Sequence, residues 1–298
     1  MMLAITGATG HTGRLFMKEL AGSQYSGQIR YMVRSEQKAN QLQSICPNAE
    51  MMVGNLKSQE DIRALLTGAD TVVNIANIRY SPEIVRIGRE CGVNRFILVH
   101  TTGIYSKYKS ASQAYFEIEE ELKPFMEECN ITILRPTMIF GDLCDHNISK
   151  FIRFVDRYPV LPIVAGGSAL IQPVNARDLA RGILMAMTEE KTKGKAYDLS
   201  GERAITVRQL YRMIGTFLGR EKPIVSLPMW LCAMGARMIK AVSFGRLDVV
   251  EKVLRMGEDR AYSHDAATAD FGYHPEAFEI GLRREVEQYI ALAKQQSA

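Results

Sequence analysis

Three glycines near the start of the chain are spaced so that they could hold a phosphate group. Gly7, Gly10 and Gly13 lie in the stretch Gly-Ala-Thr-Gly-His-Thr-Gly, after an apolar run and before an amphipathic stretch. A loop against a pyrophosphate needs a sharp turn, a close approach of the backbone and tight packing of helix on strand, and each favours a residue without Cβ. Backbone N–H groups and the positive helix end would then face the phosphates. A plain glycine-rich turn is the alternative. The predicted contacts are Gly7, Thr9, Gly10, His11, Thr12 and Gly13.

Arg34 stands at the end of the second apolar run, where a dinucleotide fold selects its coenzyme. An acidic residue about 20 positions past such a loop binds the ribose 2′-hydroxyl, whereas an arginine suits a 2′-phosphate. The sequence offers Arg34 there, and no acid before Glu36. We therefore expect NADP(H) in preference to NAD(H), with a solvated loop charge as the alternative for Arg34.

The elements that must position these residues alternate along the first half of the chain. Helical patterns separate the apolar runs, which are Met2–Thr6, Ile29–Val33, Met51–Val53, Thr71–Ile75, Phe96–Val99 and Ile131–Leu134. The helical patterns include one near Ser58–Leu66, one near Ile84–Cys91 and a long one from about Gln113 to Cys129. Strands alternating with helices at this spacing predict a parallel, doubly wound α/β sheet. The second half is less regular, and it predicts a smaller lobe without a flexible tether.

Composition narrows the classes of partner and compartment. The 298 residues are 47% hydrophobic and 23% charged with a net charge of +4, and no basic block accompanies that charge, so we expect no nucleic-acid partner. Five widely separated cysteines without a CxxC pair indicate free thiols in a reducing compartment, and neither a disulfide frame nor a metal site. The chain shows no basic-then-apolar leader, and its longest uncharged stretch, 223–236, is too short to span a bilayer. We expect a cytoplasmic protein without stable membrane insertion.

Several motifs together resemble the extended and atypical short-chain dehydrogenase/reductases over nearly the whole chain. Besides the glycine loop they are Val33-Arg34, Val53-Gly54-Asn55-Leu56, Val72–Ala76, Thr101-Thr102-Gly103, Leu134–Thr137, Pro173–Ala180 and the stretch from Asp265 to Arg284. The resemblance implies one unit with a Rossmann-like dinucleotide-binding lobe, mainly 1–140 and 170–200, and a smaller C-terminal substrate lobe, mainly 141–169 and 201–298. It also implies further cofactor contacts at Asn55, Leu56, Ile75, Ala76, Asn77 and Pro136. Asn55 stands where the family usually has an aspartate.

The family's chemistry uses a tyrosine four residues before a lysine, together with a serine or threonine. The lysine lowers the pKa of the phenol so that it can transfer a proton at neutral pH. Thr102 matches the hydroxyl position, and Tyr115 matches the tyrosine, but Glu119 stands where the lysine should be. Tyr105 and Lys109 have the required spacing in a polar segment that resembles a loop. The sequence leaves three alternatives: a Tyr105/Lys109 dyad, Tyr115 with a displaced lysine, or no such dyad.

Other polar and apolar clusters have structural explanations as well as functional ones. We expect the glutamates at 117 and 119–121 to form a solvated helix face, and His100 to pack at a strand end. Met229, Trp230, Met234 and Met238 form an apolar stripe, which indicates a core or pocket wall. The alternatives for this stripe are a lipid or quinone-like substrate, or a weak membrane contact aided by Arg237 and Lys240.

The sequence therefore supports two functions of different class. The first is an NADP(H)-dependent oxidoreductase, epimerase or dehydratase acting on a small carbonyl- or hydroxyl-bearing substrate, for example one resembling a nucleotide sugar. The second is an NADP(H)-binding redox sensor or assembly protein that has lost the tyrosine/lysine chemistry, a reading favoured by Glu119. A small molecule is the expected partner, and a homodimer is a candidate assembly.

Overall fold

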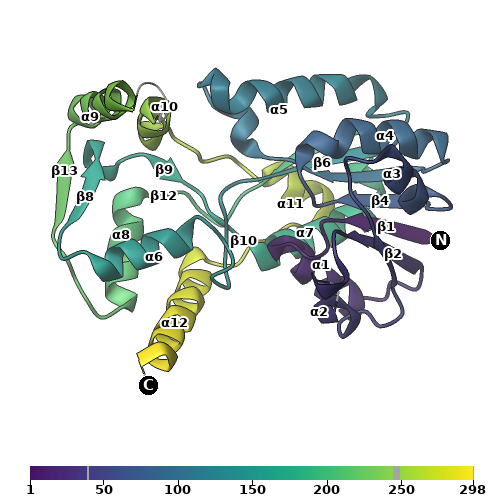
Figure 1. The fold of residues 1–298 in the computed structure, drawn as a ribbon, viewed down its shortest axis with the longest axis horizontal. Coiled ribbons are helices and arrows are strands. Elements are labelled where there is room, and N and C mark those ends of the chain that lie inside the picture. Colours follow the sequence, from purple (N-terminus) through teal and green to yellow (C-terminus); the bar gives the residue numbers. More distant parts are fainter. Residues whose placement is uncertain (39, 244–248, 298) are drawn as a thin grey trace.

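The computed structural model describes residues 1–38, 40–243 and 249–297 and shows two lobes side by side (Figure 1). The larger lobe contains a seven-stranded sheet with helices on both faces, and the smaller lobe contains helices around short two-stranded ladders. The fold class predicted from the sequence, a doubly wound parallel sheet with a smaller C-terminal lobe, is confirmed.

The central sheet is parallel throughout, in the order β11-β6-β5-β4-β1-β2-β3. Its strands are β1 (Met2–Thr6), β2 (Gln28–Val33), β3 (Glu50–Val53), β4 (Thr71–Asn74), β5 (Arg95–Val99), β6 (Ile131–Pro136) and β11 (Ala196–Leu199). β1 lies between β2 and β4, so the winding of the chain reverses beside it. In open α/β sheets the crevice outside the carboxyl ends of strands at such a switch point is where ligands bind.

The middle strands are buried and mostly apolar because helices cover both faces of the sheet. Every residue of β4 and β5 is buried, as expected for a parallel sheet between two helical layers. The helices of this lobe are α1 (His11–Gly22), α2 (Asn40–Gln43), α3 (Gln59–Leu66), α4 (Ser81–Glu90), α5 (Lys109–Leu122) and α7 (Ala176–Thr188). Short 3-10 turns in the chain are η1 (Glu36–Lys38), η2 (Ile78–Tyr80), η3 (Thr102–Tyr105), η4 (Lys123–Phe125), η5 (Ala165–Gly167), η6 (Glu190–Thr192) and η7 (Arg255–Gly257).

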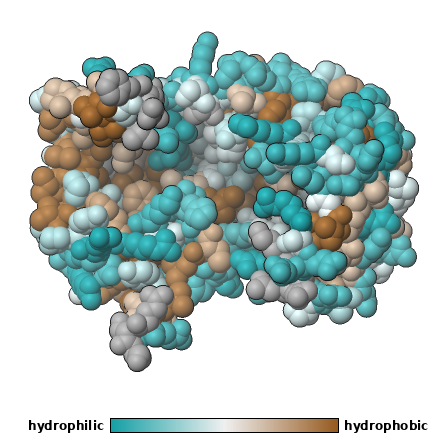
Figure 2. Space-filling view, in the orientation of Figure 1, coloured by the Kyte–Doolittle hydropathy of each residue, from teal (hydrophilic) through white to brown (hydrophobic). Residues whose placement is uncertain are grey.

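The smaller lobe has its own apolar core, and part of its outer surface is also apolar (Figure 2). Its strands are β7 (Ile139–Phe140), β8 (Leu161–Val164), β9 (Leu170–Ile171), β10 (Val174–Asn175), β12 (Ile205–Thr206) and β13 (Ile224–Leu227). Its helices are α6 (Ile148–Arg157), α8 (Val207–Phe217), α9 (Met229–Val242), α10 (Val250–Leu254) and α12 (Phe278–Ser297). No helix within the described residues is long and apolar enough to cross a bilayer.

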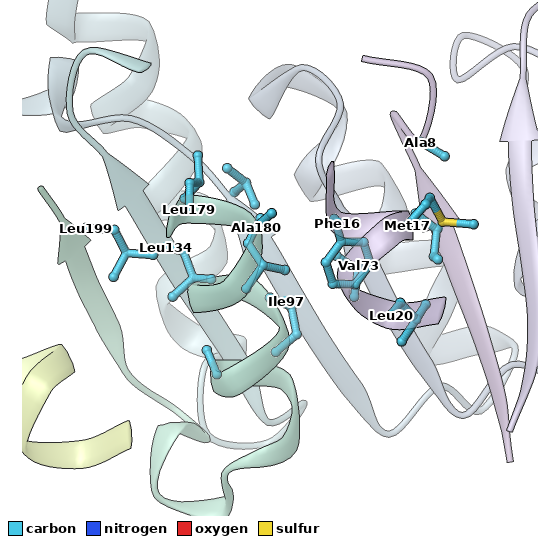
Figure 3. Close-up of a cluster of buried hydrophobic side chains, with 14 of the residues drawn as sticks. Ala8, Phe16, Met17, Leu20, Val73, Ile97, Leu134, Leu179, Ala180 and Leu199 are labelled. Carbon is cyan, nitrogen blue, oxygen red and sulfur yellow. The ribbon is translucent and has the colours of Figure 1, made fainter. Parts of the chain in front are cut away.

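The core of the larger lobe anchors the first helix, and thereby the glycine loop that precedes it. Phe16, Met17 and Leu20 of α1 lie on the same face of the sheet as Leu179 and Ala180 of α7, which packs beside α1 (Figure 3). These side chains are buried completely or almost completely. The end of α1 that faces the carboxyl edge of the sheet is therefore held in place by packing along the rest of the helix.

One segment lies in a different lobe from the one that the sequence predicts. α11 (Asp265–Phe271) packs beside β11, and Phe271 and Tyr273 are buried in the core of the larger lobe. The Phe271 ring meets the Tyr197 ring edge-on, with their centroids 5.2 Å apart. The chain thus returns to the first lobe within the range 201–298 that the sequence places in the second.

Candidate functional site

The glycine loop joins β1 to α1 and fits tightly between neighbouring backbone segments. Gly7 has a φ of +76°, and a Cβ there would lie 2.6 Å from the backbone nitrogen of Ala76. A Cβ on Gly13 would lie 2.1 Å from the carbonyl oxygen of Gly7. The loop closes with a hydrogen bond from Gly10 N–H to Gly7 O of 2.9 Å, and α1 begins at His11 with Gly10 as its N-cap. The first N–H groups of the helix therefore remain available to an anion.

A cavity of about 970 Å³ lies at the carboxyl ends of β1 to β4, beside this loop. It is lined by Thr6, Gly7, Thr9, Gly10, Met32, Val33, Arg34, Gln37, Gly54, Asn55, Leu56, Lys57, Ile75, Ala76, Asn77 and Tyr80. This volume is at the upper end of the usual range for ligand pockets. The glycine loop, the free N–H groups at the start of α1 and a cavity that extends along the ends of four strands fit a dinucleotide.

The cavity wall is basic where the second and third strands end. Arg34 and Lys57 both line it, and the lining among the described residues includes no aspartate or glutamate. Arg34 forms no hydrogen bond or ion pair with any described residue, so its guanidinium is available to a ligand. Two cations without a carboxylate suit a phosphate better than a ribose hydroxyl.

Most of the cofactor residues predicted from the sequence line this cavity, and four do not. Those that line it are Gly7, Thr9, Gly10, Arg34, Asn55, Leu56, Ile75, Ala76 and Asn77. The other four, His11, Thr12, Gly13 and Pro136, lie outside its lining. Thr12 is buried, and Gly13 is packed against the loop itself.

The sequence did not predict seven of the lining residues, which are Thr6, Met32, Val33, Gln37, Gly54, Lys57 and Tyr80. A signal was present for those that adjoin a predicted residue, which are Thr6, Val33, Gly54 and Lys57. The others enter the cavity because separate strands end at one edge of the sheet.

His11, the first residue of α1, has charged side chains of both signs near it. Its Nε2 is buried and has no partner among the described residues. Burial lowers the pKa of this imidazole, although Asp142 and Asp145 nearby act to raise it. The ring is therefore neutral at neutral pH.

A chain of buried hydrogen bonds runs from the cavity towards α5. Thr6 Oγ1 donates to Asn74 Oδ1 at 2.6 Å, and Asn74 Nδ2 donates to Ser81 Oγ at 3.0 Å. His100 continues the chain, with its Nε2 3.0 Å from Ser81 Oγ and its Nδ1 3.0 Å from Glu119 Oε1. Because a carboxylate can only accept, Nδ1 carries the hydrogen and Nε2 accepts from Ser81. Burial lowers the pKa of His100 and keeps the ring neutral.

Glu119 ends this chain in a buried ion pair, which corrects the prediction of a solvated glutamate face. Arg135 binds both carboxylate oxygens, with its Nε at 3.0 Å and 3.1 Å. Burial acts to raise the pKa of Glu119, but the hydrogen bonds from His100 and Arg135 outweigh it and lower that pKa. Glu119 is therefore ionised, and its charge is neutralised by the guanidinium.

Arg135 also contacts the first candidate tyrosine. Its Nη1 donates to the Tyr105 hydroxyl at 2.9 Å, and that hydroxyl donates to the Asp198 carboxylate at 3.1 Å. Burial and Asp198 raise the pKa of Tyr105 to about 12, although Arg135 acts to lower it. The phenol therefore stays protonated at neutral pH.

Tyr105 and Lys109 are separated by a change of element. Tyr105 ends η3, whereas Lys109 is the first residue of α5, which starts four residues earlier than the predicted Gln113. Lys109 is exposed, and within the described parts of the chain it has no hydrogen bond or ion pair with Tyr105. The two are not joined as a dyad.

The remaining candidates, Thr102 and Tyr115, lie near each other at the end of β5. Thr102 Oγ1 donates to the carbonyl oxygen of Pro136 at 3.2 Å and is buried. A Cβ on Gly103 would lie 3.2 Å from the ring of Tyr115, so this ring packs over the turn that follows Thr102. No described residue forms a hydrogen bond with the Tyr115 hydroxyl. No group of three or more His, Cys, Asp or Glu side chains in the described ranges is placed to bind a metal.

Comparison with known proteins adds a family model and several relatives. Residues 7–145 match the model described as NAD(P)H-binding. The NADH dehydrogenase (ubiquinone) 1 alpha subcomplex subunit 9, mitochondrial, of Arabidopsis thaliana is 26% identical over 249 residues, or 76% of this chain. The chain spans 60% of the length of that relative. The photosystem II assembly factor Ycf39 of Cyanidium caldarium is 21% identical over 273 residues, covering 86% of this chain and 85% of that protein.

The fold also matches solved structures along its whole length. The dTDP-glucose 4,6-dehydratase of Streptomyces venezuelae, solved with NAD bound, superposes with a TM-score of 0.76 over 99% of this chain and 98% of its own. The sequence identity is 17%, so this likeness concerns the fold.

Proposed function

We propose that the chain, whose motifs resemble the extended short-chain dehydrogenase/reductases, holds NADP(H) as a ligand for redox sensing or for assembly of a protein complex. The match of residues 7–145 to the NAD(P)H-binding model supports this proposal, as does the likeness of the fold to an NAD-bound dTDP-glucose 4,6-dehydratase. The observation that supports this proposal most strongly is the engagement of Glu119. It stands where the family has its lysine, and its carboxylate is committed to Arg135 and His100. Because a glutamate occupies this position, the lysine that would lower the pKa of the Tyr115 phenol is missing from it.

The residues that would hold the dinucleotide follow from the cavity. The N–H groups of His11, Thr12 and Gly13 would face the pyrophosphate beside Gly10, and Arg34 with Lys57 would bind the 2′-phosphate. Asn55 and Leu56 would contact the adenine, and Ile75, Ala76, Asn77 and Pro136 would flank the ribose and nicotinamide. When bound, the nicotinamide supplies a hydride donor or acceptor.

A second candidate function is turnover of a small carbonyl- or hydroxyl-bearing substrate, including one resembling a nucleotide sugar. The observation in its favour is the position of Tyr115, whose hydroxyl is without a described partner and whose ring packs next to the turn after Thr102. In this reading Thr102 and Tyr115 handle the proton on the substrate oxygen. Tyr105 is less suited, because its hydroxyl already contacts Arg135 and Asp198.

Calorimetric titration and a turnover assay together separate the two functions. We expect NADPH to bind more tightly than NADH, with no oxidation of bound NADPH on a panel of carbonyl compounds and nucleotide sugars. Turnover that is lost in Tyr115→Phe would establish the enzyme and refute the sensor or assembly role. Absence of any dinucleotide binding would refute both.

Two wider expectations are also proposed. The described cysteines are all free thiols, which supports a reducing compartment such as the cytoplasm. A homodimer is testable by measuring the mass of the protein in solution with and without NADPH.

A further inference from the structure

The helix α9 turns its large apolar side chains towards solvent. Trp230, Met234, Met238 and Val242 follow one another at four-residue intervals, and their exposed fractions are 66%, 45%, 62% and 78%. Residues at this spacing share one face of a helix. The sequence predicts that Met229, Trp230, Met234 and Met238 form a core or pocket wall. The exposure of the last three shows that this expectation is wrong for most of the stripe.

The inner face of the helix explains this orientation. Its buried residues are the small Ala233 and Ala236, and α10 packs beside α9. Small residues allow a close approach but bury little apolar area. The helix therefore packs against the fold with its small apolar residues and leaves its large apolar residues exposed to solvent. A helix in this orientation costs free energy in water unless something covers the outer face.

The apolar surface continues from α9 onto the adjoining strand. β13 leads into α9 through Pro228, and Val225 of β13 is 48% exposed. On the strand side of the lobe, Val160 just before β8 is 44% exposed. Figure 2 shows apolar residues gathered along the edge of the smaller lobe over β13 and β8, below α9. The surface is thus larger than a single helix turn.

The charge of α9 is of one sign. Its fourteen residues include Arg237 and Lys240, both exposed, and no aspartate or glutamate. α9 lies at the outer end of the smaller lobe, away from the seven-stranded sheet (Figure 1). A short helix with tryptophan and aliphatic residues on one face and basic residues beside them has the chemistry of a helix that lies in the headgroup region of a bilayer.

We propose that the outer face of α9 binds the surface of an anionic lipid membrane, with Trp230, Met234, Met238 and Val242 among the acyl chains and Arg237 and Lys240 towards the headgroups. The absence of acidic residues from α9 favours anionic lipid over a basic protein surface. The exposed stripe lies on a single outward face of the helix. A planar bilayer can cover such a face more completely than a single bound peptide helix can. This role goes beyond dinucleotide binding and does not depend on it.

The single tryptophan of the chain makes the proposal directly measurable. Trp230 is the first member of the exposed stripe and is 66% exposed, so its fluorescence reports contact with lipid without any label. With vesicles of phosphatidylcholine containing phosphatidylglycerol, we expect a shift of its emission to shorter wavelength and co-sedimentation of the protein. With phosphatidylcholine alone, or at high salt, binding should weaken by roughly tenfold or more, since screening reduces the attraction of basic residues to anionic lipid.

Matched variants distinguish binding through this surface from nonspecific adsorption of the protein to vesicles. Met234→Asp with Met238→Asp should abolish sedimentation with anionic vesicles, and Arg237→Glu should reduce it. Phe116→Asp on α5 is the control, because Phe116 is 50% exposed on another helix, and this change should leave lipid binding unchanged. NADPH affinity equal to that of the unaltered chain verifies that each variant is folded. No tryptophan shift with anionic vesicles would overturn the proposal, as would a stable dimer that Met238→Asp dissociates, because a second copy would then cover the face.

Discussion

Arg135 holds both carboxylate oxygens of Glu119, and the two side chains are 16% and 9% exposed. This ion pair lies between β6 and α5 and connects the polar chain from Thr6 with the contact of Arg135 on Tyr105. The position of this ion pair indicates that Glu119 stabilises the fold. Glu119 also replaces the lysine of the catalytic pattern.

Removing one partner of this pair should destabilise the protein. Glu119→Ala leaves Arg135 buried with only the more distant carboxylate of Asp198, 3.7 Å away, so we expect the free energy of unfolding to fall by about 3 kcal/mol. Denaturant unfolding monitored by circular dichroism measures the change. Glu120→Ala, at an exposed position in the same helix, should alter it by less than about 0.5 kcal/mol. A loss below about 1 kcal/mol for Glu119→Ala would contradict the assigned role.

Arg34 should set the preference for the phosphorylated coenzyme. In Arg34→Asp we expect NADP affinity to fall by roughly tenfold or more, since a hydrogen bond to a charged group contributes about 1.5–3 kcal/mol. NAD affinity should change little or improve, because the new carboxylate can bind a ribose hydroxyl. Titration calorimetry with both coenzymes measures the two constants. Lys18→Asp, an exposed charge reversal on α1 outside the cavity lining, is the control; unchanged NADP affinity in Arg34→Asp would refute the clamp.

Lys57 faces the same cavity and should act with Arg34. We expect Lys57→Ala to weaken NADP binding less than Arg34→Asp does, because the arginine remains to bind the phosphate with two nitrogens. Combining the changes should remove the preference for NADP over NAD. The comparison of the single and double variants by calorimetry would fail to support this arrangement if the double variant still preferred NADP.

The glycines of the loop should differ in their tolerance of a methyl group. Gly13→Ala would place Cβ 2.1 Å from Gly7 O, whereas Gly10→Ala would place it at 3.2 Å and Gly22→Ala would meet nothing within 4 Å. We expect NADPH binding to be lost in Gly13→Ala, weakened in Gly10→Ala and unchanged in Gly22→Ala. Thermal-shift titration ranks the three. Equal affinity in all of them would show that the loop does not form the cradle.

Glu285 should make the stability of the protein fall as the pH rises. This side chain in α12 is fully buried, and neither carboxylate oxygen has a partner among the described residues. Burial, with Asp145 beside it, raises its pKa to about 9. The unfolded chain releases this proton near the ordinary pKa of about 4.3. Between these values the folded state binds more protons than the unfolded state, so the stabilisation present at low pH is lost progressively up to about pH 9.

Glu285→Gln isolates this contribution. The slope belonging to one such group is at most about 1.4 kcal/mol per pH unit, and the amide should remove it. Denaturant unfolding at several pH values between 5 and 9 measures the difference between the two proteins. Glu287→Gln, at an exposed position two residues further along α12, should leave the dependence as it is. Parallel pH profiles for Glu285→Gln and the unaltered chain would contradict the prediction.

Local patterns predicted the sheet and the glycine loop well. The apolar runs 2–6 and 71–75 agree with β1 and β4 to within one residue, because a strand buried on both faces leaves a continuous apolar signal. Gly7 and Gly13 were identified because no other residue fits such close backbone contacts.

Features that depend on distant parts of the chain could not be predicted in the same way. Glu119 resembled its exposed neighbours until the position of Arg135 on β6 was known. Lys57 and Tyr80 share a cavity only because different strands end together. For α9, helical periodicity located an apolar face, but periodicity does not indicate whether that face points inwards.

The return of α11 to the first lobe has a consequence for how the molecule is built. Ala267, Phe271 and Tyr273 complete a core whose other buried members lie before residue 200, and the Tyr273 hydroxyl donates to the carbonyl oxygen of Ser200 at 3.1 Å. A fragment that ends after β11 would lack these rings and leave Tyr197 open to water. The first half is thus not a self-sufficient folding unit, and the dinucleotide pocket owes part of its support to residues synthesised some 260 positions after the glycine loop.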